Sequence, residues 1–149
     1  MNKNIFITMW GNDGCESSNF ALLPSLLYIA EYAKGNTDEE RIKAKFKRIT
    51  GIDYDDFMLI DIPNQVDMNT SCKLPPNPVK YMFYSDYFSD FLDVTVRDDV
   101  NSYEYYDSAA KKLFAVAKKS RKYGYLFDAS AKMCEVMKYK YELGKKTRA

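Results

Sequence analysis

Apolar residues recur at helical spacing over most of the chain beyond residue 17. The clearest case lies between Thr37 and Gly51, where Ile42, Phe46 and Ile49 fall on one face of a helix. The first four residues of this segment have the form of a capping box, and the glycine is a typical C-terminal stop. The pattern therefore predicts a helix capped by Thr37.

Four further segments are predicted to be helical from the same spacing and from their end signals. Their ranges are 19–34, 53–61, 102–119 and 125–143. The last two should form an antiparallel pair about Gly124. The final helix should bury a stripe made of Leu126, Ala129, Met133, Val136 or Met137, and Lys140 or Tyr141.

Capping residues, prolines and aromatic residues modify this helical pattern in three segments. Ser17 or Ser18 can cap the first helix, which Pro24 should bend or restart. Prolines make 62–78 a long connection, and the aromatic segment 81–93 is predicted to contain one or two short helical turns.

One short strand is predicted before the helices. Ile5–Met9 is a β-branched and apolar run that ends at a glycine-rich turn. The fold class is therefore mainly α, a helical bundle-like domain preceded by one short β-strand. Because no clear partner strand follows, we expect the isolated chain to self-associate as a homo-oligomer through this segment or to leave it unstructured.

Composition and charge narrow the class of protein. The chain has 149 residues, an apolar fraction of 46%, and 22 basic against 21 acidic residues, which is typical of one globular domain and does not indicate nucleic acid as a partner. No apolar run is long enough for a membrane span. Cys15, Cys72 and Cys134 are odd in number and widely spaced, which favours reduced thiols and a cytoplasmic location.

The absence of histidine restricts the possible chemistry. It excludes serine–histidine and cysteine–histidine catalysis and histidine-ligated zinc. Asp86, Asp90 and Asp93 lack the EF-hand pattern and are interpreted as a solvated face. No metal site, cofactor or catalytic residue is predicted within this chain.

Polar and aromatic residues are concentrated where the predicted strand ends. Trp10 is followed by Gly11, and Asn12, Asp13 and Glu16 can project beside the start of the next helix. An indole can stack on a sugar ring while amide and carboxylate oxygens bond its hydroxyls. A turn with a core tryptophan and local capping explains the same residues equally well.

The order of several motifs resembles a known enzyme family. The segments 8–16 (TMWGNDGCE), 20–24 (FALLP), 28–32 (YIAEY), 46–51 (FKRITG), 77–81 (NPVKY) and 123–127 (YGYLF) are similar to the barrel end and C-terminal helical domain of a bacterial subgroup of family 20 glycoside hydrolases, the β-N-acetylhexosaminidases. The subgroup carries an acidic residue where this chain has Asn12, whose amide can still bond a hydroxyl.

The resemblance implies a retaining reaction in which the substrate's N-acetyl oxygen attacks the anomeric carbon beside an Asp-Glu pair. Asp38-Glu39 is the only such dipeptide here, and its place at a helix start favours capping. A catalytic barrel needs about 250 residues, so this chain alone should be inactive.

The leading hypothesis divides the chain into a barrel-edge strand and Trp-Gly turn at 1–16 and a C-terminal helical domain at 17–149. In this hypothesis the partners are the catalytic barrel of the parent protein and an N-acetylhexosamine-containing glycan, bound in part by Trp10, Asn12, Asp13 and Glu16. Two alternatives remain: an independent helical scaffold for a protein partner, and a small carbohydrate-binding module.

Overall fold

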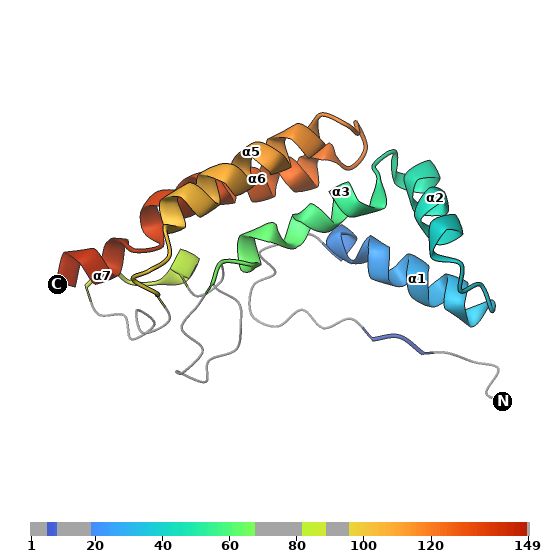
Figure 1. Ribbon diagram of the computed structural model, residues 1–149, viewed down its shortest axis with the longest axis horizontal. Coiled ribbons are helices and arrows are strands. Elements are labelled where there is room, and N and C mark those ends of the chain that lie inside the picture. The colour runs from blue at the N-terminus through green and yellow to red at the C-terminus, as the bar shows by residue number, and fades with distance from the viewer. Residues whose placement is uncertain (1–5, 9–18, 68–81, 89–95, 149) are drawn as a thin grey trace.

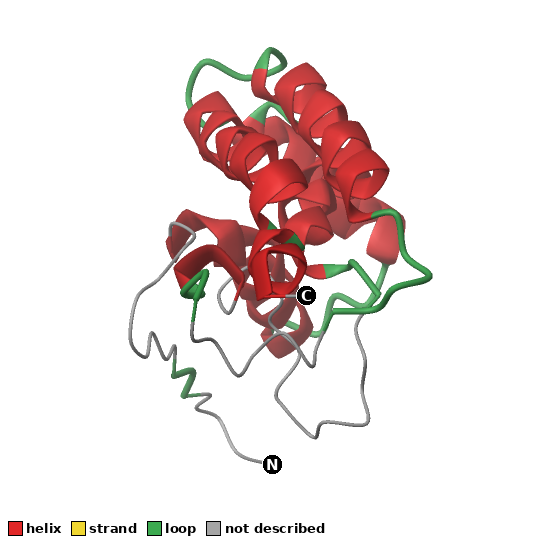
Figure 2. Cartoon of the chain, turned by 90° about the vertical axis from the view of Figure 1, so that its left-hand side faces the viewer, coloured by secondary structure: helices red, strands yellow, loops and turns green. Residues whose placement is uncertain are grey.

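The computed structural model describes residues 6–8, 19–67, 82–88 and 96–148. All regular secondary structure in these ranges is helical, and Figure 2 shows no strand among them. The predicted mainly α fold is therefore confirmed. The strand expected at Ile5–Met9 is not formed at residues 6–8, where Phe6 is 91% exposed and none of the described segments supplies a strand to pair with. Ile5 and Met9 lie outside the described ranges.

Two long helices form the centre of the fold, as the sequence predicted. Helix α5 (Ser102–Ala117) and helix α6 (Gly124–Lys140) lie side by side as a hairpin (Figure 1). The side chain of Asn101 caps α5 by accepting a hydrogen bond of 3.1 Å from the Glu104 amide. Both helices end two or three residues before their predicted ends.

The buried stripe of α6 is rotated from the predicted one. Leu126, Met137 and Tyr141 are buried as expected, whereas Ala129 and Val136 are exposed. The buried stripe instead includes Phe127, Ser130, Ala131 and Cys134. Both stripes have helical spacing. Phe127 has no exposed surface, and its ring is larger than the side chains of Ala129 and Val136, so burying it contributes more hydrophobic free energy.

A shorter helical segment packs against this hairpin. Helix α3 (Tyr54–Met58) continues directly as the 3-10 helix η2 (Leu59–Asn64), so residues 62–64 are helical where a loop was expected. The Phe57 ring meets Phe46 at 4.9 Å and Phe127 at 5.2 Å between ring centroids, both edge to face. These aromatic contacts join α3 to the two parts of the core.

Helix α2 (Glu39–Thr50) ends at Gly51 as predicted, in the left-handed conformation with φ of 77°. Its predicted start is wrong by one position, because Asp38 rather than Thr37 accepts the capping hydrogen bond, from the Arg41 amide at 3.2 Å. The inward face is also shifted. Ile49 is 48% exposed and Thr50 is buried in its place, where the Thr50 hydroxyl donates to the Phe46 carbonyl at 2.9 Å.

The first helical segment restarts close to its proline, as predicted. A 3-10 helix, η1 (Asn19–Leu22), passes into α1 (Leu23–Ala33), and Pro24 occupies the first turn of α1. This position tolerates proline because its backbone nitrogen needs no helical partner there. Helix α1 packs against α2 and α3 at the edge of the assembly (Figure 1).

Helical structure continues beyond residue 143, where the last predicted helix ends. Helix α7 (Leu143–Arg148) follows α6 after a short turn. Of the aromatic segment 81–93, residues 82–84 form one helical turn, while residues 81 and 89–93 lie outside the described part.

Candidate functional site

The predicted sugar-binding residues are not placed by the structure. Trp10, Asn12, Asp13 and Glu16 all lie in 9–18, outside the described residues. Their proximity to one another therefore stays a prediction. The nearest described residues along the chain are Thr8 on one side and Asn19, the first residue of η1, on the other.

Helix α1, which follows that segment, has an unusual distribution of side chains. Its sequence is apolar nearly all round, with one charged residue in eleven. Leu23 and Leu27 pack against the core, whereas Ile29 is 36% and Tyr32 is 48% exposed. A helix with an ordinary surface position would present polar residues on that outer side.

The single charged residue of α1 is turned inward. Glu31 is only 6% exposed, and its carboxylate accepts hydrogen bonds from Lys45 Nζ at 2.5 Å and Asn36 Nδ2 at 2.9 Å. These hydrogen bonds, with the charges of Lys45 and Lys34, hold the pKa of Glu31 below its usual value. The carboxylate is thus used to attach α1 to α2 and is not available for acid–base chemistry on a ligand.

The outer side of α1 includes an open apolar hollow of about 450 Å³, lined by Tyr28, Ile29, Tyr32 and Ala33. The Tyr28 and Tyr32 rings stack with centroids 6.1 Å apart. The hollow contains no charged side chain. It is suited to another apolar surface and not to a polar substrate.

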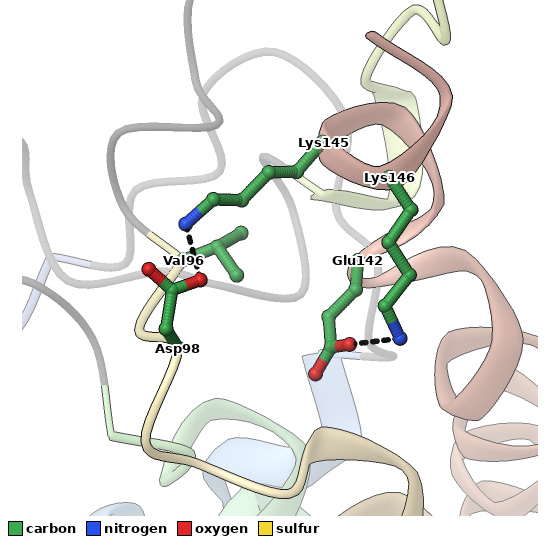
Figure 3. Close-up of a pocket in the computed structure, with 5 residues that line it drawn as sticks. All are labelled: Val96, Asp98, Glu142, Lys145 and Lys146. Atoms are coloured by element: carbon green, nitrogen blue, oxygen red, sulfur yellow. Dashed lines mark hydrogen bonds and ion pairs between the residues drawn. The ribbon is translucent and has the colours of Figure 1, made fainter. Parts of the chain in front are cut away.

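A second pocket of about 400 Å³, lined mainly by charged residues (Figure 3), lies at the α7 end of the fold, opposite α1 (Figure 1). Its charged residues are already paired: Lys145 Nζ lies 2.6 Å from Asp98 and Lys146 Nζ lies 2.5 Å from Glu142. Burial alone would raise the pKa of Glu142, but hydrogen bonds from Lys146 and Ser102 bring it below its usual value. We interpret this pocket as an ion-paired junction of α7 with the segment before α5.

A third group of polar and aromatic residues joins α5 to α6. The Lys138 side chain is 9% exposed and lies between Asp107, at 3.1 Å, and Glu135, at 2.9 Å. Both contacts raise the pKa of Lys138. The rings of Tyr103 and Tyr139 meet beside it at 5.5 Å, and all the charged groups of this cluster are paired. The cluster helps to hold α5 against α6. The sequence analysis did not predict it.

The groups considered for chemistry have structural roles where they are described. Asp38 is the cap of α2 and, like Glu39, is exposed, which agrees with the capping interpretation. Asp86 accepts a hydrogen bond from the Phe88 amide at 2.7 Å, while Asp90 and Asp93 lie outside the described residues. No group of three possible metal ligands occurs within the described ranges.

Cys134 is the described cysteine, and it is fully buried as a free thiol. Burial raises its pKa to about 12, which removes the thiolate needed for nucleophilic attack. In the part of the chain that the structure describes, no helix is both long and apolar enough to cross a membrane.

Comparison with known proteins gives one finding. The model of the glycoside hydrolase 20C C-terminal domain matches residues 55–149, which extend from α3 through α5 and α6 to the chain end. No curated protein matches the chain. The matched region covers more than half of the sequence and includes the whole central hairpin. This chain therefore belongs to the family of glycoside hydrolase 20C C-terminal domains.

Proposed function

We propose that this chain is the C-terminal helical domain of a β-N-acetylhexosaminidase and packs against the catalytic barrel of that protein. The observation that carries the proposal is the family match over residues 55–149. The matched region contains the α5–α6 hairpin and the α3–η2 segment that covers it. Helices α1 and α2 precede this region and are proposed to connect it to the barrel.

In this proposal the Trp-Gly turn forms one wall of the subsite for the terminal sugar. The Trp10 indole stacks on the apolar face of an N-acetylhexosamine ring. The carboxylates of Asp13 and Glu16 accept hydrogen bonds from its hydroxyls, the Asn12 amide can accept or donate one, and the barrel supplies the other walls. Support comes from the residue types, their spacing and the family membership of the chain.

The acid–base groups of the reaction are proposed to come from the barrel. Hydrolysis with retention needs one carboxyl group that protonates the leaving oxygen and another that orients the acetamido group. Three of the less exposed described carboxylates, Glu31, Glu142 and Asp107, are held by lysines in structural ion pairs. Because a catalytic barrel needs about 250 residues, the chain by itself should not hydrolyse glycosides.

A cytoplasmic location is part of the same proposal. The buried free thiol of Cys134 is compatible with a reducing compartment.

Packing on a barrel would also provide neighbours for the apolar residues Phe6 and Ile7, which are 91% and 42% exposed. Self-association through this segment is then expected only when the chain is separated from the barrel.

The test compares the chain with the complete protein that carries it. The complete protein is expected to release N-acetylglucosamine from a chromogenic β-glycoside, and the separate 149-residue chain is expected to be inactive at equal concentration. Glycosidase activity in the separate chain contradicts the proposed division of roles. A complete protein without activity on any β-N-acetylhexosaminide favours the alternative, a helical scaffold that binds a protein partner.

One observation supports that alternative. Tyr103, Tyr125 and Tyr139 on the central hairpin are between 46% and 65% exposed, and exposed tyrosines are common in protein interfaces. If the scaffold alternative is correct, this chain should bind a second protein stably, and its affinity for that protein should be the same with and without the barrel.

A further inference from the structure

The outer side of α1 forms an apolar surface that the described residues leave uncovered. We define this surface as the α1 face, made of Ile29, Tyr32 and Ala33 on α1 and of Leu22, which directly precedes the helix. Leu22, Ile29 and Tyr32 are 40%, 36% and 48% exposed, and Ala33 is also exposed. Tyr32 and Ala33 follow Ile29 by three and four residues, which places these three along one side of the helix. No charged residue interrupts this side.

The inward position of Glu31 fixes which side of α1 faces outward. Lys45 and Asn36 hold its carboxylate against α2, and Leu23 and Leu27 contact the core. Rotating α1 to hide Ile29 and Tyr32 would break these ion-pair and hydrogen-bond contacts and expose the leucines. The apolar side is therefore held toward the exterior by specific contacts.

We propose that the α1 face is the surface on which the catalytic barrel of the same polypeptide docks. This inference rests on the proposed function above, and it adds which helix makes the contact. Helix α1 lies on the N-terminal side of the region that matches a C-terminal domain family. It is thus the described helix closest along the chain to the part of such a protein that precedes the domain.

The size of the α1 face favours a covalently linked partner over a second copy of this chain. A helix of 11 residues is about 16 Å long and about 10 Å wide. One side of the helix therefore offers an area on the order of 160 Å². A stable complex between separate proteins needs about 800 Å² per partner, which is far more. A partner in the same polypeptide has a high effective concentration, so a small apolar contact suffices.

The polar surroundings of the hollow fit the same partner. Its lining residues Tyr28 and Tyr32 each bring a hydroxyl beside an otherwise apolar wall. Such amphipathic rings are enriched in protein interfaces, where the ring is buried and the hydroxyl can find a polar partner. A free sugar would find no carboxylate or amide in this hollow.

Hydroxyl-radical footprinting of the complete protein tests the inference without any mutation. Tyr32 and Tyr125 are 48% and 52% exposed in this chain, so they should be oxidised at similar rates if neither is covered. Docking of the barrel on the α1 face is expected to slow oxidation of Tyr32 by about fivefold or more relative to Tyr125, because interface cores exclude water.

A matched pair of variants of the complete protein adds a second readout. Ile29→Glu places a charge in the docked surface and should raise Tyr32 oxidation to the Tyr125 rate. Val136→Glu makes the same change at another exposed β-branched residue, on α6, and should leave Tyr32 protected. Far-ultraviolet circular dichroism verifies that both variants remain helical.

The possible outcomes separate this inference from the proposed function. If Tyr32 reacts as fast as Tyr125 while Tyr103 and Tyr139 are protected, the barrel docks elsewhere and the α1 inference is wrong, although the proposed function stands. If none of the described tyrosines is protected, packing of this domain on the barrel is contradicted as well.

Discussion

Lys45 Nζ lies 2.5 Å from Glu31 Oε1, and this ion pair joins the only charged residue of α1 to the middle of α2. The contact determines the orientation of α1. With Glu31 held inward, Ile29 and Tyr32 face outward. An ion pair thus occupies the helix interface, and an apolar surface is left where solvent would normally meet polar residues.

The Glu31 contact predicts a specific dependence of stability on pH. The pKa of Glu31 is lower in the folded chain than in the unfolded chain. Its contribution is therefore complete above the ordinary glutamate pKa of about 4.3 and is lost as the pH falls through the folded pKa. Glu31→Gln should lower the denaturant midpoint at about pH 6. On acidification from that pH, the variant should then lose less stability than the parent chain, because the group that titrates is gone. A variant that loses as much stability on acidification as the parent chain contradicts this account.

Gly124 is predicted to be intolerant of alanine although it lies in a helix. A Cβ at this position would overlap the Ala117 carbonyl oxygen and would lie 3.2 Å from its carbonyl carbon. Helix propensity alone favours Gly124→Ala by about 1 kcal/mol. We expect instead a loss of about 1–3 kcal/mol in the free energy of unfolding, because the start of α6 must move away from α5.

Gly51→Asn is a suitable comparison for this substitution. Gly51 has a positive φ of 77°, and its nearest neighbour to an added Cβ is Ser120 Oγ at 3.8 Å. Asparagine adopts this conformation more readily than other residues, so the loss should stay below about 1 kcal/mol. A more stable Gly124→Ala variant, measured by urea unfolding, is the result that would sink the packing argument.

Buried Tyr141 and half-buried Tyr105 should respond oppositely to removal of the hydroxyl. Within the described residues, Tyr141 Oη is buried without a hydrogen-bond partner, whereas Tyr105 Oη donates to the Ile62 carbonyl at 2.5 Å. Tyr141→Phe should be neutral or stabilising by up to about 1 kcal/mol, and Tyr105→Phe destabilising by about 1 kcal/mol. Equal losses in thermal unfolding would show that Tyr141 has a partner in the folded protein.

Alkaline pH should unfold the domain cooperatively. Burial raises the pKa of the Cys134 thiol and of the Tyr141 phenol, each to about 12. The unfolded chain releases these protons near pH values of about 8.5 and about 10. Because the folded pKa values are higher than the unfolded ones, the free energy of unfolding is unaffected by these two groups below their unfolded pKa values. Above an unfolded pKa, and up to the folded pKa of about 12, it falls by up to about 1.4 kcal/mol per pH unit for each group.

Tyrosinate absorbance and circular dichroism followed together test this expectation. Ionisation of the buried tyrosines and loss of helix should occur in one transition. Complete ionisation of all tyrosines at their ordinary pKa with the helical signal intact would mean that the described core is open to solvent.

The sequence predicted the helices well because their end signals are local. Gly51 ends α2 and Pro24 lies in the first turn of α1, since both residues act through their own backbone. Faces were predicted less well. Ile49 and Val136 fit helical spacing but are exposed, because the choice between neighbouring stripes depends on the helix packed opposite.

The outward face of α1 could have been found from the sequence. A segment with one charge in eleven residues is apolar on all sides, and such a helix needs cover on all sides. The inward orientation of Glu31 could not have been predicted from the sequence, because it depends on Lys45, which is 14 residues away. The predicted sugar site at Trp10 stays a prediction, since it lies outside the described residues.

The most direct test of the central claim is the effect of Trp10→Ala on glycoside hydrolysis by the complete protein. The proposed stacking of Trp10 on the terminal sugar predicts a fall in kcat/KM of at least about tenfold, with weaker inhibition by free N-acetylglucosamine. Tyr125→Ala, at a 52% exposed position on α6, should leave both values unchanged. An unchanged kcat/KM in the Trp10→Ala protein would contradict the assignment of this turn to the sugar subsite.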